Sequence, residues 1–294
     1  MKVEILKGNE IAEVYGIYTG DGRCEAVISR PGTDKLVFIL STLYGCPVGC
    51  SFCDASLEYR GKISHGDLIR QYEALLERSE PPGNFSKFKI QFSRMGEPAY
   101  NRDVLEAIRT ILDNNKYDPV ISISTIAPLY TDKFFQELKI LLKHYGSRYD
   151  FQIQFSLHST DRKQRDTLMP AKKMSFMHLG KTGSALKQYI RRKITLNFAL
   201  HSKSIIDPDK LKKHFDPEIF ILKFTPVNPT ASSRKSSIDT TDDSNAWNRF
   251  SHIIEKCSRA GYDVIESVGD FRENAVNSNC GQYVFDSAIS REVS

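Results

Sequence analysis

Three cysteines stand close together after an apolar segment near residue 40. Cys46, Cys50 and Cys53 are spaced Cys-x3-Cys-x2-Cys. Thiolates this close within one loop suit an iron–sulfur cluster, because three of them can hold three irons of a 4Fe–4S cube. The fourth iron is then open to a substrate or cofactor, as the open position is in catalytic zinc sites. The spacing therefore predicts a cluster with a chemically available corner.

Zinc and ordinary buried thiols are the alternatives for these cysteines. Zinc usually takes four protein ligands in paired elements, and the sequence contains no second pair of this kind. The sequence therefore favours the iron–sulfur interpretation. Phe52, directly before the last of the three cysteines, would shield one side of the cluster from water.

This cysteine spacing resembles that of the radical S-adenosylmethionine (SAM) superfamily. The resemblance implies a 4Fe–4S cluster and SAM as cofactors, with the amino and carboxylate groups of SAM on the open iron. It also implies an electron donor such as flavodoxin or ferredoxin. The electron would cleave SAM to a 5′-deoxyadenosyl radical.

Further segments resemble the RlmN/Cfr family of ribosomal and transfer RNA adenine C-methyltransferases. They follow the family's order and extend the resemblance over about residues 20 to 285: segment 93–101 with its Met-Gly-Glu-Pro run, then 124–125, 156–158, Arg165, Pro170, 225–229 and 279–283. The resemblance implies a SAM site that includes Phe52, Gly96, Glu97, Ser124, Ser156, Leu157, His158 and Asn228. Taken singly, each has another explanation, such as a core histidine at His158.

Cys280, in the run Asn-Cys-Gly-Gln-Tyr, matches the family's methyl-carrying cysteine. The resemblance implies that one SAM methylates its sulfur and that the radical from a second SAM removes a hydrogen from this methyl group. The carbon radical would then add to an sp2 carbon of the substrate. A purely structural thiol is the alternative.

The chain departs from the family at Ile39, where the family has a second cysteine that releases the product. Three alternatives follow: Cys24 approaches the site from the N-terminal hairpin and releases the product, an external thiol does so, or the substrate never bonds to Cys280. The first is the one that we expect. The neighbouring Glu25 matches a family glutamate thought to accept a proton during release, and its alternative is an exposed strand carboxylate.

Alternating strands and helices must position these residues. Apolar or alternating runs predict strands at 37–41, 88–93, 120–124, 151–156, 194–200 and 219–224. Amphipathic runs predict helices at 68–76, 104–112, 134–142, 185–192 and 246–257. Six such units predict an α/β fold, an open, partial (β/α)6 barrel of the radical SAM type. The residues of the implied SAM site fall at the carboxyl ends of these strands, where barrel active sites form.

Two regions are expected outside this core. Residues 1–35 predict a small β-hairpin extension, and residues 36–294 form the barrel with the C-terminal segment that carries Cys280. The polar segment 230–244 predicts a mobile loop that either closes the barrel mouth or merely connects two elements.

Composition is that of a globular protein. The 294 residues are 40% hydrophobic and 26% charged, and the longest apolar run has only the five residues 36–40. These values exclude a disordered chain or a membrane-spanning helix. The charged N-terminus lacks a signal peptide's apolar stretch, which predicts a cytoplasmic protein.

The net charge is +5, and positive charge is concentrated between residues 167 and 206, where there is no Asp or Glu. Such a segment can bind RNA phosphates or can simply be a solvated surface. Only 45 residues precede Cys46, too few for the family's RNA-binding N-terminal domain together with the hairpin. The substrate is then either RNA held by the 167–206 segment or a small heteroaromatic molecule.

Three functions follow. The first is a methyltransferase that acts on an sp2 carbon through methylated Cys280. The second is a radical SAM enzyme that uses the deoxyadenosyl radical directly on a small molecule or peptide. The third is a non-catalytic iron–sulfur protein that senses redox state or binds RNA.

Overall fold

Parallel strands form the centre of the molecule. The computed structural model describes residues 1–57, 59–114, 116–240 and 247–285. Seven strands pair in parallel, in the order β4 (Lys35–Leu40), β7 (Lys87–Phe92), β8 (Val120–Thr125), β9 (Phe151–Ser156), β10 (Ile194–Leu200), β11 (Phe220–Pro226) and β12 (Val264–Glu266). The six expected strands are β4 and β7 to β11, within two residues at each end.

The N-terminal segment continues this sheet with antiparallel strands. β1 (Lys2–Gly8), β2 (Ala12–Tyr18) and β3 (Arg23–Ser29) pair in sequence, and β3 pairs with β4. The segment is thus a three-stranded meander instead of the expected two-stranded hairpin. β1 has no fully buried residue, so its sequence carries little of the alternation that reveals a strand. A domain boundary near residue 35 stays a prediction.

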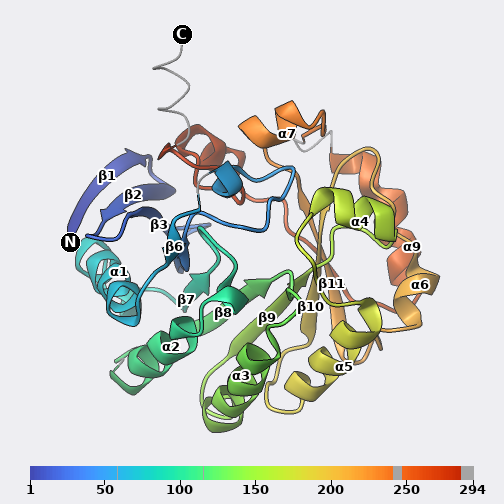
Figure 1. Cartoon of the computed structure of the whole chain (residues 1–294), viewed down its shortest axis with the longest axis horizontal. Coiled ribbons are helices and arrows are strands. Elements are labelled where there is room, and N and C mark those ends of the chain that lie inside the picture. Colours follow the sequence, from blue (N-terminus) through green and yellow to red (C-terminus); the bar gives the residue numbers. More distant parts are fainter. Residues whose placement is uncertain (58, 115, 241–246, 286–294) are drawn as a thin grey trace.

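Helices cover the outer face of the curved sheet (Figure 1). The larger ones are α1 (His65–Arg78), α2 (Asp103–Asn114), α3 (Asp132–Tyr145), α5 (Phe176–Lys187) and α9 (Ser251–Arg259). Shorter helices are α4 (Arg162–Leu168), α6 (Pro208–Lys212) and α7 (Ala231–Lys235), and a small ribbon joins β5 (Leu43–Tyr44) to β6 (Gly61–Lys62). The helix expected at 185–192 instead ends at Lys187, and the expected 246–257 begins at Ser251 as an α-helix.

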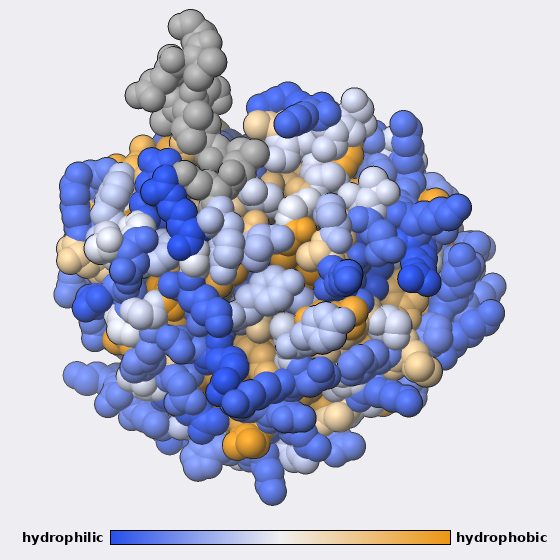
Figure 2. Space-filling model, in the orientation of Figure 1, coloured by the Kyte–Doolittle hydropathy of each residue, from blue (hydrophilic) through white to orange (hydrophobic). Residues whose placement is uncertain are grey.

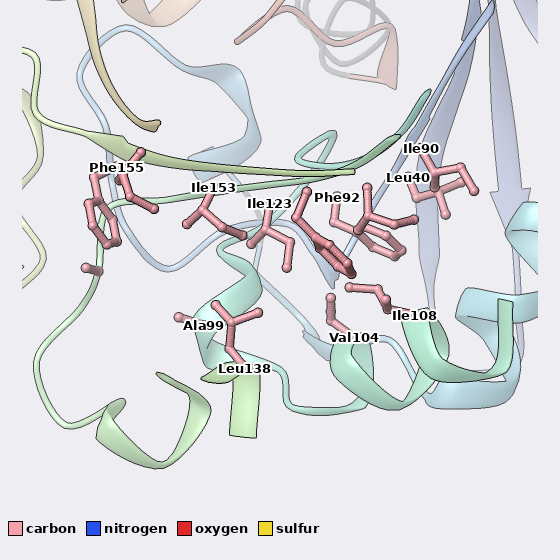
Figure 3. Close-up of a cluster of buried hydrophobic side chains, with 14 of the residues drawn as sticks. Leu40, Ile90, Phe92, Ala99, Val104, Ile108, Ile123, Leu138, Ile153 and Phe155 are labelled. Atoms are coloured by element: carbon pink, nitrogen blue, oxygen red, sulfur yellow. The ribbon is translucent and has the colours of Figure 1, made fainter. Parts of the chain in front are cut away.

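Side chains alternate across each parallel strand. Ile90, Phe92, Ile123 and Ile153 point outward onto α2 and α3 (Figure 3). The inward positions are mostly polar and line a cavity: Lys89, Gln91, Ser122, Ser124, Gln154, Ser156, Asn197, Lys223 and Thr225. The period-two pattern therefore separates an apolar core from a polar barrel interior.

The remaining surface is mainly hydrophilic on the face in Figure 2, with hydrophobic residues in small groups. No helix in the described ranges is long and apolar enough to span a membrane. The fold class expected from the sequence, an α/β fold with an open parallel sheet, is confirmed.

Candidate active site

A cavity of about 330 Å³ opens at the carboxyl ends of the parallel strands. Cys46, Cys50, Cys53 and Cys280 all line it, although Cys280 is more than 220 residues distant in sequence from the other three. Among the described residues, no three Cys, His, Asp or Glu side chains converge on a single metal ion. A cube binds each thiolate at a different iron, so its ligands do not need to converge on one ion.

The three motif cysteines lie in the loop of residues 45–53, which we call the cluster loop. It follows β5, and its last residue precedes Asp54. Burial raises the pKa of Cys46 to about 12 and also raises the pKa of Cys50 and Cys53. Thiols are poorly ionised in such surroundings unless a cation is present, and iron is such a cation. The donor set therefore fits a cluster.

Side-chain and backbone hydrogen bonds fix the cluster loop to α7. The Asp54 carboxylate accepts hydrogen bonds from the backbone N–H groups of Ala231 and Ser232, at 3.2 and 2.8 Å. Thr230 Oγ1 donates to the carbonyl of Phe52 at 3.1 Å. The start of the segment 230–244 is therefore an anchored helix, not the mobile loop that we expected. Residues 241–244 of that segment lie outside the described residues.

Glu97 organises the turn after β7. Its carboxylate accepts hydrogen bonds from Thr125 Oγ1, from the backbone N–H of Ile126 at 2.8 Å and from that of Ala99 at 3.0 Å. Burial raises the pKa of Glu97 to about 7, although these three hydrogen bonds favour the ionised form. Gly96 has φ +96°, and a Cβ there would lie 2.5 Å from the Cβ of Leu43. Only glycine fits this approach.

His158 is held as a neutral imidazole. Its Nδ1 accepts a hydrogen bond from the Ala199 backbone N–H at 3.0 Å, so the ring proton is on Nε2. Burial lowers the pKa of His158 to about 3. The Phe52 ring packs edge-on against it, with centroids 4.9 Å apart. Phe52 and His158 thus form one wall of the cavity beside the cluster loop.

Of the eight residues in the implied SAM site, seven line this cavity: Phe52, Gly96, Glu97, Ser124, Ser156, His158 and Asn228. The eighth, Leu157, is fully buried in the hydrophobic core and is not among the lining residues. It follows Ser156 at the end of β9. SAM binding by these residues stays a prediction.

Cys280 lies in the loop of residues 277–283, which we call the carrier loop. Its side chain is accessible to solvent because it lies in the cavity, yet protein surrounds it and burial raises the pKa of its thiol. Asn228 Nδ2 donates to the Cys280 carbonyl at 3.0 Å, and the Gly281 carbonyl accepts from the Asp54 N–H at 2.9 Å. A Cβ at Gly281 would lie 3.0 Å from the Phe52 carbonyl oxygen. The carrier loop and the cluster loop are therefore in direct contact.

Arg94 and Glu25 hold the carrier loop from the other side. Glu25 Oε1 accepts from the Val284 and Phe285 N–H groups at 2.7 and 2.9 Å, and its Oε2 pairs with Arg94 at 2.6 Å. Arg94 also donates to the carbonyls of Asn277 and Ser278 at 2.7 and 3.1 Å. Sequence reasoning missed Arg94, although an arginine directly after an apolar strand and before the Met-Gly-Glu-Pro run was a usable signal.

These contacts bear on the role of Glu25. The side chain is fully buried, so the alternative of an exposed carboxylate is wrong. Both of its oxygens have partners, and Glu25 is not among the residues that line the cavity. Its role as a proton acceptor stays a prediction, whereas the observed contacts are those of a positioning residue.

Cys24 cannot approach the site as we expected. It neighbours Glu25 on β3, so the two side chains point to opposite faces of the sheet. Its thiol is fully buried in the hydrophobic core, and burial raises its pKa. Ile39 does line the cavity. The residue that the resemblance aligns with a product-releasing cysteine therefore lies at the cavity, and it has no thiol.

The segment 167–206 is less cationic than its sequence suggests. Arg191 and Arg192 both pair with Asp150, and Lys193 pairs with Asp263. These three residues precede β10, at the end of the strands opposite the cavity mouth. Lys173, nearer the mouth, pairs with Asp166 at 2.7 Å. RNA binding by this segment stays a prediction.

Known proteins resemble the chain in sequence and in fold. A probable dual-specificity RNA methyltransferase RlmN from Pseudothermotoga lettingae is 24% identical over 263 residues, which are 86% of this chain and 70% of that protein. The RlmN of Pelodictyon phaeoclathratiforme is 32% identical over 57% of this chain and 45% of its own length. The chain resembles the RlmN-type radical SAM methyltransferases.

Solved structures resemble the chain in fold. A radical SAM methyltransferase from Sphaerobacter thermophilus superposes with a TM-score of 0.73 at 18% identity, over 95% of this chain and 80% of that one. Streptococcus suis SuiB, solved with S-adenosylmethionine bound, gives a TM-score of 0.54 at 14% identity, over 80% of this chain and 50% of SuiB. No protein-family model matches the chain. The expected resemblance is confirmed, and the comparisons support the enzyme class, a radical SAM methyltransferase.

Proposed function

We propose that the chain is a radical SAM enzyme that transfers a one-carbon unit to an sp2 carbon through S-methylated Cys280. The observation that carries this proposal is that Cys280 lines the same cavity as the three cysteines of the cluster loop. The cluster and SAM, when bound, supply the electron and the 5′-deoxyadenosyl radical. A methyl group on Cys280 Sγ would then lie within the cavity where that radical forms.

Other residues of the chain would bind the two cofactors and position the carrier loop. Cys46, Cys50 and Cys53 would hold the cluster, while the turn after β7, Ser124, Ser156, His158 and Asn228 would hold SAM. The neutral His158 ring can donate a hydrogen bond only from Nε2, because Nδ1 is already engaged. Asn228 would contact both SAM and the carrier loop, since its side chain also donates a hydrogen bond to the Cys280 carbonyl. Arg94 and Glu25 would hold the carrier loop in place, so that Cys280 stays at the cavity.

The substrate is an RNA adenine or another heteroaromatic molecule. RlmN-named relatives favour RNA, and the electron donor would be a protein such as flavodoxin or ferredoxin. The chain would also need a thiol to release the product, and Cys24 does not reach the cavity. We propose that an external thiol fills that role.

One observation favours a second candidate. Ile39 lines the cavity at the position of the missing thiol. Among the residues that the structure describes, the only cysteines lining the cavity are the three of the cluster loop and Cys280. An enzyme that uses the deoxyadenosyl radical directly on its substrate needs neither a carrier nor a releasing thiol.

Anaerobic incubation of the reconstituted protein with SAM and dithionite tests the proposal and separates these candidates. We expect wild-type protein and the control Cys257→Ala, whose thiol is buried in the core, to label the protein from methyl-labelled SAM. Cys280→Ala should take up no label. If Cys280→Ala formed product and 5′-deoxyadenosine at the wild-type rate, the direct radical reaction would replace methyl transfer. If neither the wild-type protein nor any variant cleaved SAM, the protein would be a non-catalytic iron–sulfur protein.

A further inference from the structure

We propose that Lys89 and Lys223 bind the anionic group, a carboxylate or phosphate, of a small-molecule substrate in the barrel interior. The inference rests on the proposed function in taking this cavity as the substrate site. It goes beyond that function by assigning a charge and a size class to the substrate.

The two lysines face the same cavity from distant strands. Lys89 is on β7 and Lys223 is on β11, with β8, β9 and β10 between them in the sheet. Both line the cavity, and the Lys89 side chain is only 8% exposed. Lys89 Nζ donates to Gln152 Oε1 at 3.1 Å, which leaves further ammonium protons for another acceptor. The positive charge of Lys223 favours the thiolate form of Cys280. Lys223 therefore lies near the carrier cysteine.

Several cations lie around Lys89. Burial lowers the pKa of Lys89 to about 7, and the charges of Lys223, Lys35, Lys87 and Arg192 add to this effect. The two carboxylates that line the cavity have other partners: Glu97 is held by the turn after β7, and Glu273 accepts from Ser29 at 2.7 Å. Within the described ranges, no ion pair joins Lys89 or Lys223 to a carboxylate. Buried cations of this kind are unfavourable unless an anion accompanies them.

A second observation points to a ligand at the same place. Asn197 is 7% exposed and lines the cavity, and its Oδ1 has no hydrogen-bond partner among the described residues. Asn197 and Lys223 are direct register neighbours on β10 and β11. A buried amide oxygen without a donor is rare in native proteins. The expected ligand therefore carries an N–H or O–H group beside its anionic group.

This arrangement favours a small molecule over RNA. When an enzyme takes a base out of an RNA chain, the base enters the pocket and the phosphates stay at the rim. The interior of the pocket then contacts only the neutral ring of the base. Here the interior carries the cations, whereas several cations of the 167–206 segment are paired with carboxylates and lie away from the mouth. An anionic group is thus expected inside the barrel.

Thermal unfolding of the cluster-loaded protein with inorganic phosphate or acetate, at constant ionic strength, tests the inference. We expect at least one anion to raise the unfolding temperature of the wild type. Lys89→Met and Lys223→Met should each weaken that anion's binding by about ten-fold or more, the effect of losing a charge-assisted hydrogen bond. The control Lys143→Met removes the same charge from an exposed residue of α3, away from the cavity, and should keep the full shift. Comparing phosphate with acetate identifies the group.

Three results from the thermal-shift and SAM-binding measurements would overturn the inference. They are no shift in wild-type protein with either anion, an equal shift in all variants, and an equal loss of SAM affinity in both lysine variants, which would place the carboxylate of SAM at the lysines. Salt-dependent RNA binding that fell in the two lysine variants but not in Lys143→Met would also contradict it. Cys280→Ala should retain the anion shift, so failure of methyl transfer and failure of this inference are distinguishable.

Discussion

The carboxylate of Glu25 and the guanidinium of Arg94 form a buried ion pair, with 2.6 Å between Oε2 and Nη2. One residue is on β3 and the other is in the turn after β7, and both also bind backbone groups of the C-terminal segment around Cys280. This pair therefore joins the N-terminal meander, the Met-Gly-Glu-Pro turn and the carrier loop. It thereby holds the segment on both sides of Cys280 to the rest of the fold.

Glu25→Gln should destabilise the protein strongly, because the substitution leaves the Arg94 charge buried without its counter-ion. The loss of a partner in a buried pair costs about 3–5 kcal/mol of unfolding free energy. Glu255→Gln is the matched control, since its pair with Arg259 is exposed and such helix pairs contribute about 0.3–0.5 kcal/mol. Denaturant unfolding measures both. Equal midpoints for the two variants would show that the ion pair does not hold the loop.

Removal of a cluster-loop thiol should remove the cluster. Cys46→Ala, Cys50→Ala and Cys53→Ala should each abolish the brown chromophore and SAM cleavage together, because a cube held by three thiolates has no spare ligand. Cys257→Ala should keep both, since its thiol is buried in the core on α9. Iron analysis and absorption spectra provide the readout. Iron at cube stoichiometry in a triple Ala variant would refute the ligand assignment.

Gly96→Ala should destabilise the turn that carries Glu97. A Cβ at residue 96 would lie 2.5 Å from the Leu43 Cβ, and φ +96° disfavours an L side chain. We expect a loss of about 1–3 kcal/mol for the backbone conformation, before the steric clash is added. Gly66→Ala, in α1 with open space around its Cβ, should be neutral or stabilising by up to about 1 kcal/mol. If both variants unfolded alike, the tight approach to Leu43 would be wrong.

Lys89 should make stability depend on pH in a predictable direction. Its pKa is lowered from 10.5 to about 7, so between about pH 7 and about pH 10 the unfolded chain binds more protons than the folded one. Stability attributable to Lys89 therefore rises with pH across that window, and the penalty is complete below it. Without anions, Lys89→Met should be more stable than wild type at pH 7, and the difference should shrink by pH 10. A constant difference would contradict the lowered pKa.

Sequence alone predicted the strands well because apolar and polar residues alternate clearly in them, as in Val-Ile-Ser-Ile-Ser at β8. It misplaced the helix expected at 185–192, which the structure has at Phe176–Lys187, because α5 contains Gly180 and Gly183, which usually interrupt helices. In the fold they allow close contacts, since a Cβ at Gly180 would lie 2.1 Å from the His214 carbonyl oxygen. Such a requirement depends on a partner distant in sequence and cannot be found locally.

The candidate site divides in the same way. The cysteine spacing and the Met-Gly-Glu-Pro run are local, so their residues could be named from the sequence. The partners of Arg94 lie about 180 residues later in the chain, at Asn277 and Ser278. Lys89 and Lys223 were visible as lysines within apolar strands, but only the sheet order brings them to one cavity. The orientation of Cys24 also depended on which face of β3 meets the core.

Mass spectrometry of the purified protein tests the central claim most directly. After expression with iron and SAM available, the peptide that contains Cys280 should carry one methyl group on sulfur, and the peptide with Cys257 should carry none. The methyl group should be absent when any cysteine of the cluster loop is changed to Ala, because self-methylation needs the loaded enzyme. A Cys280 peptide that remained unmethylated in protein active on its substrate would contradict the account.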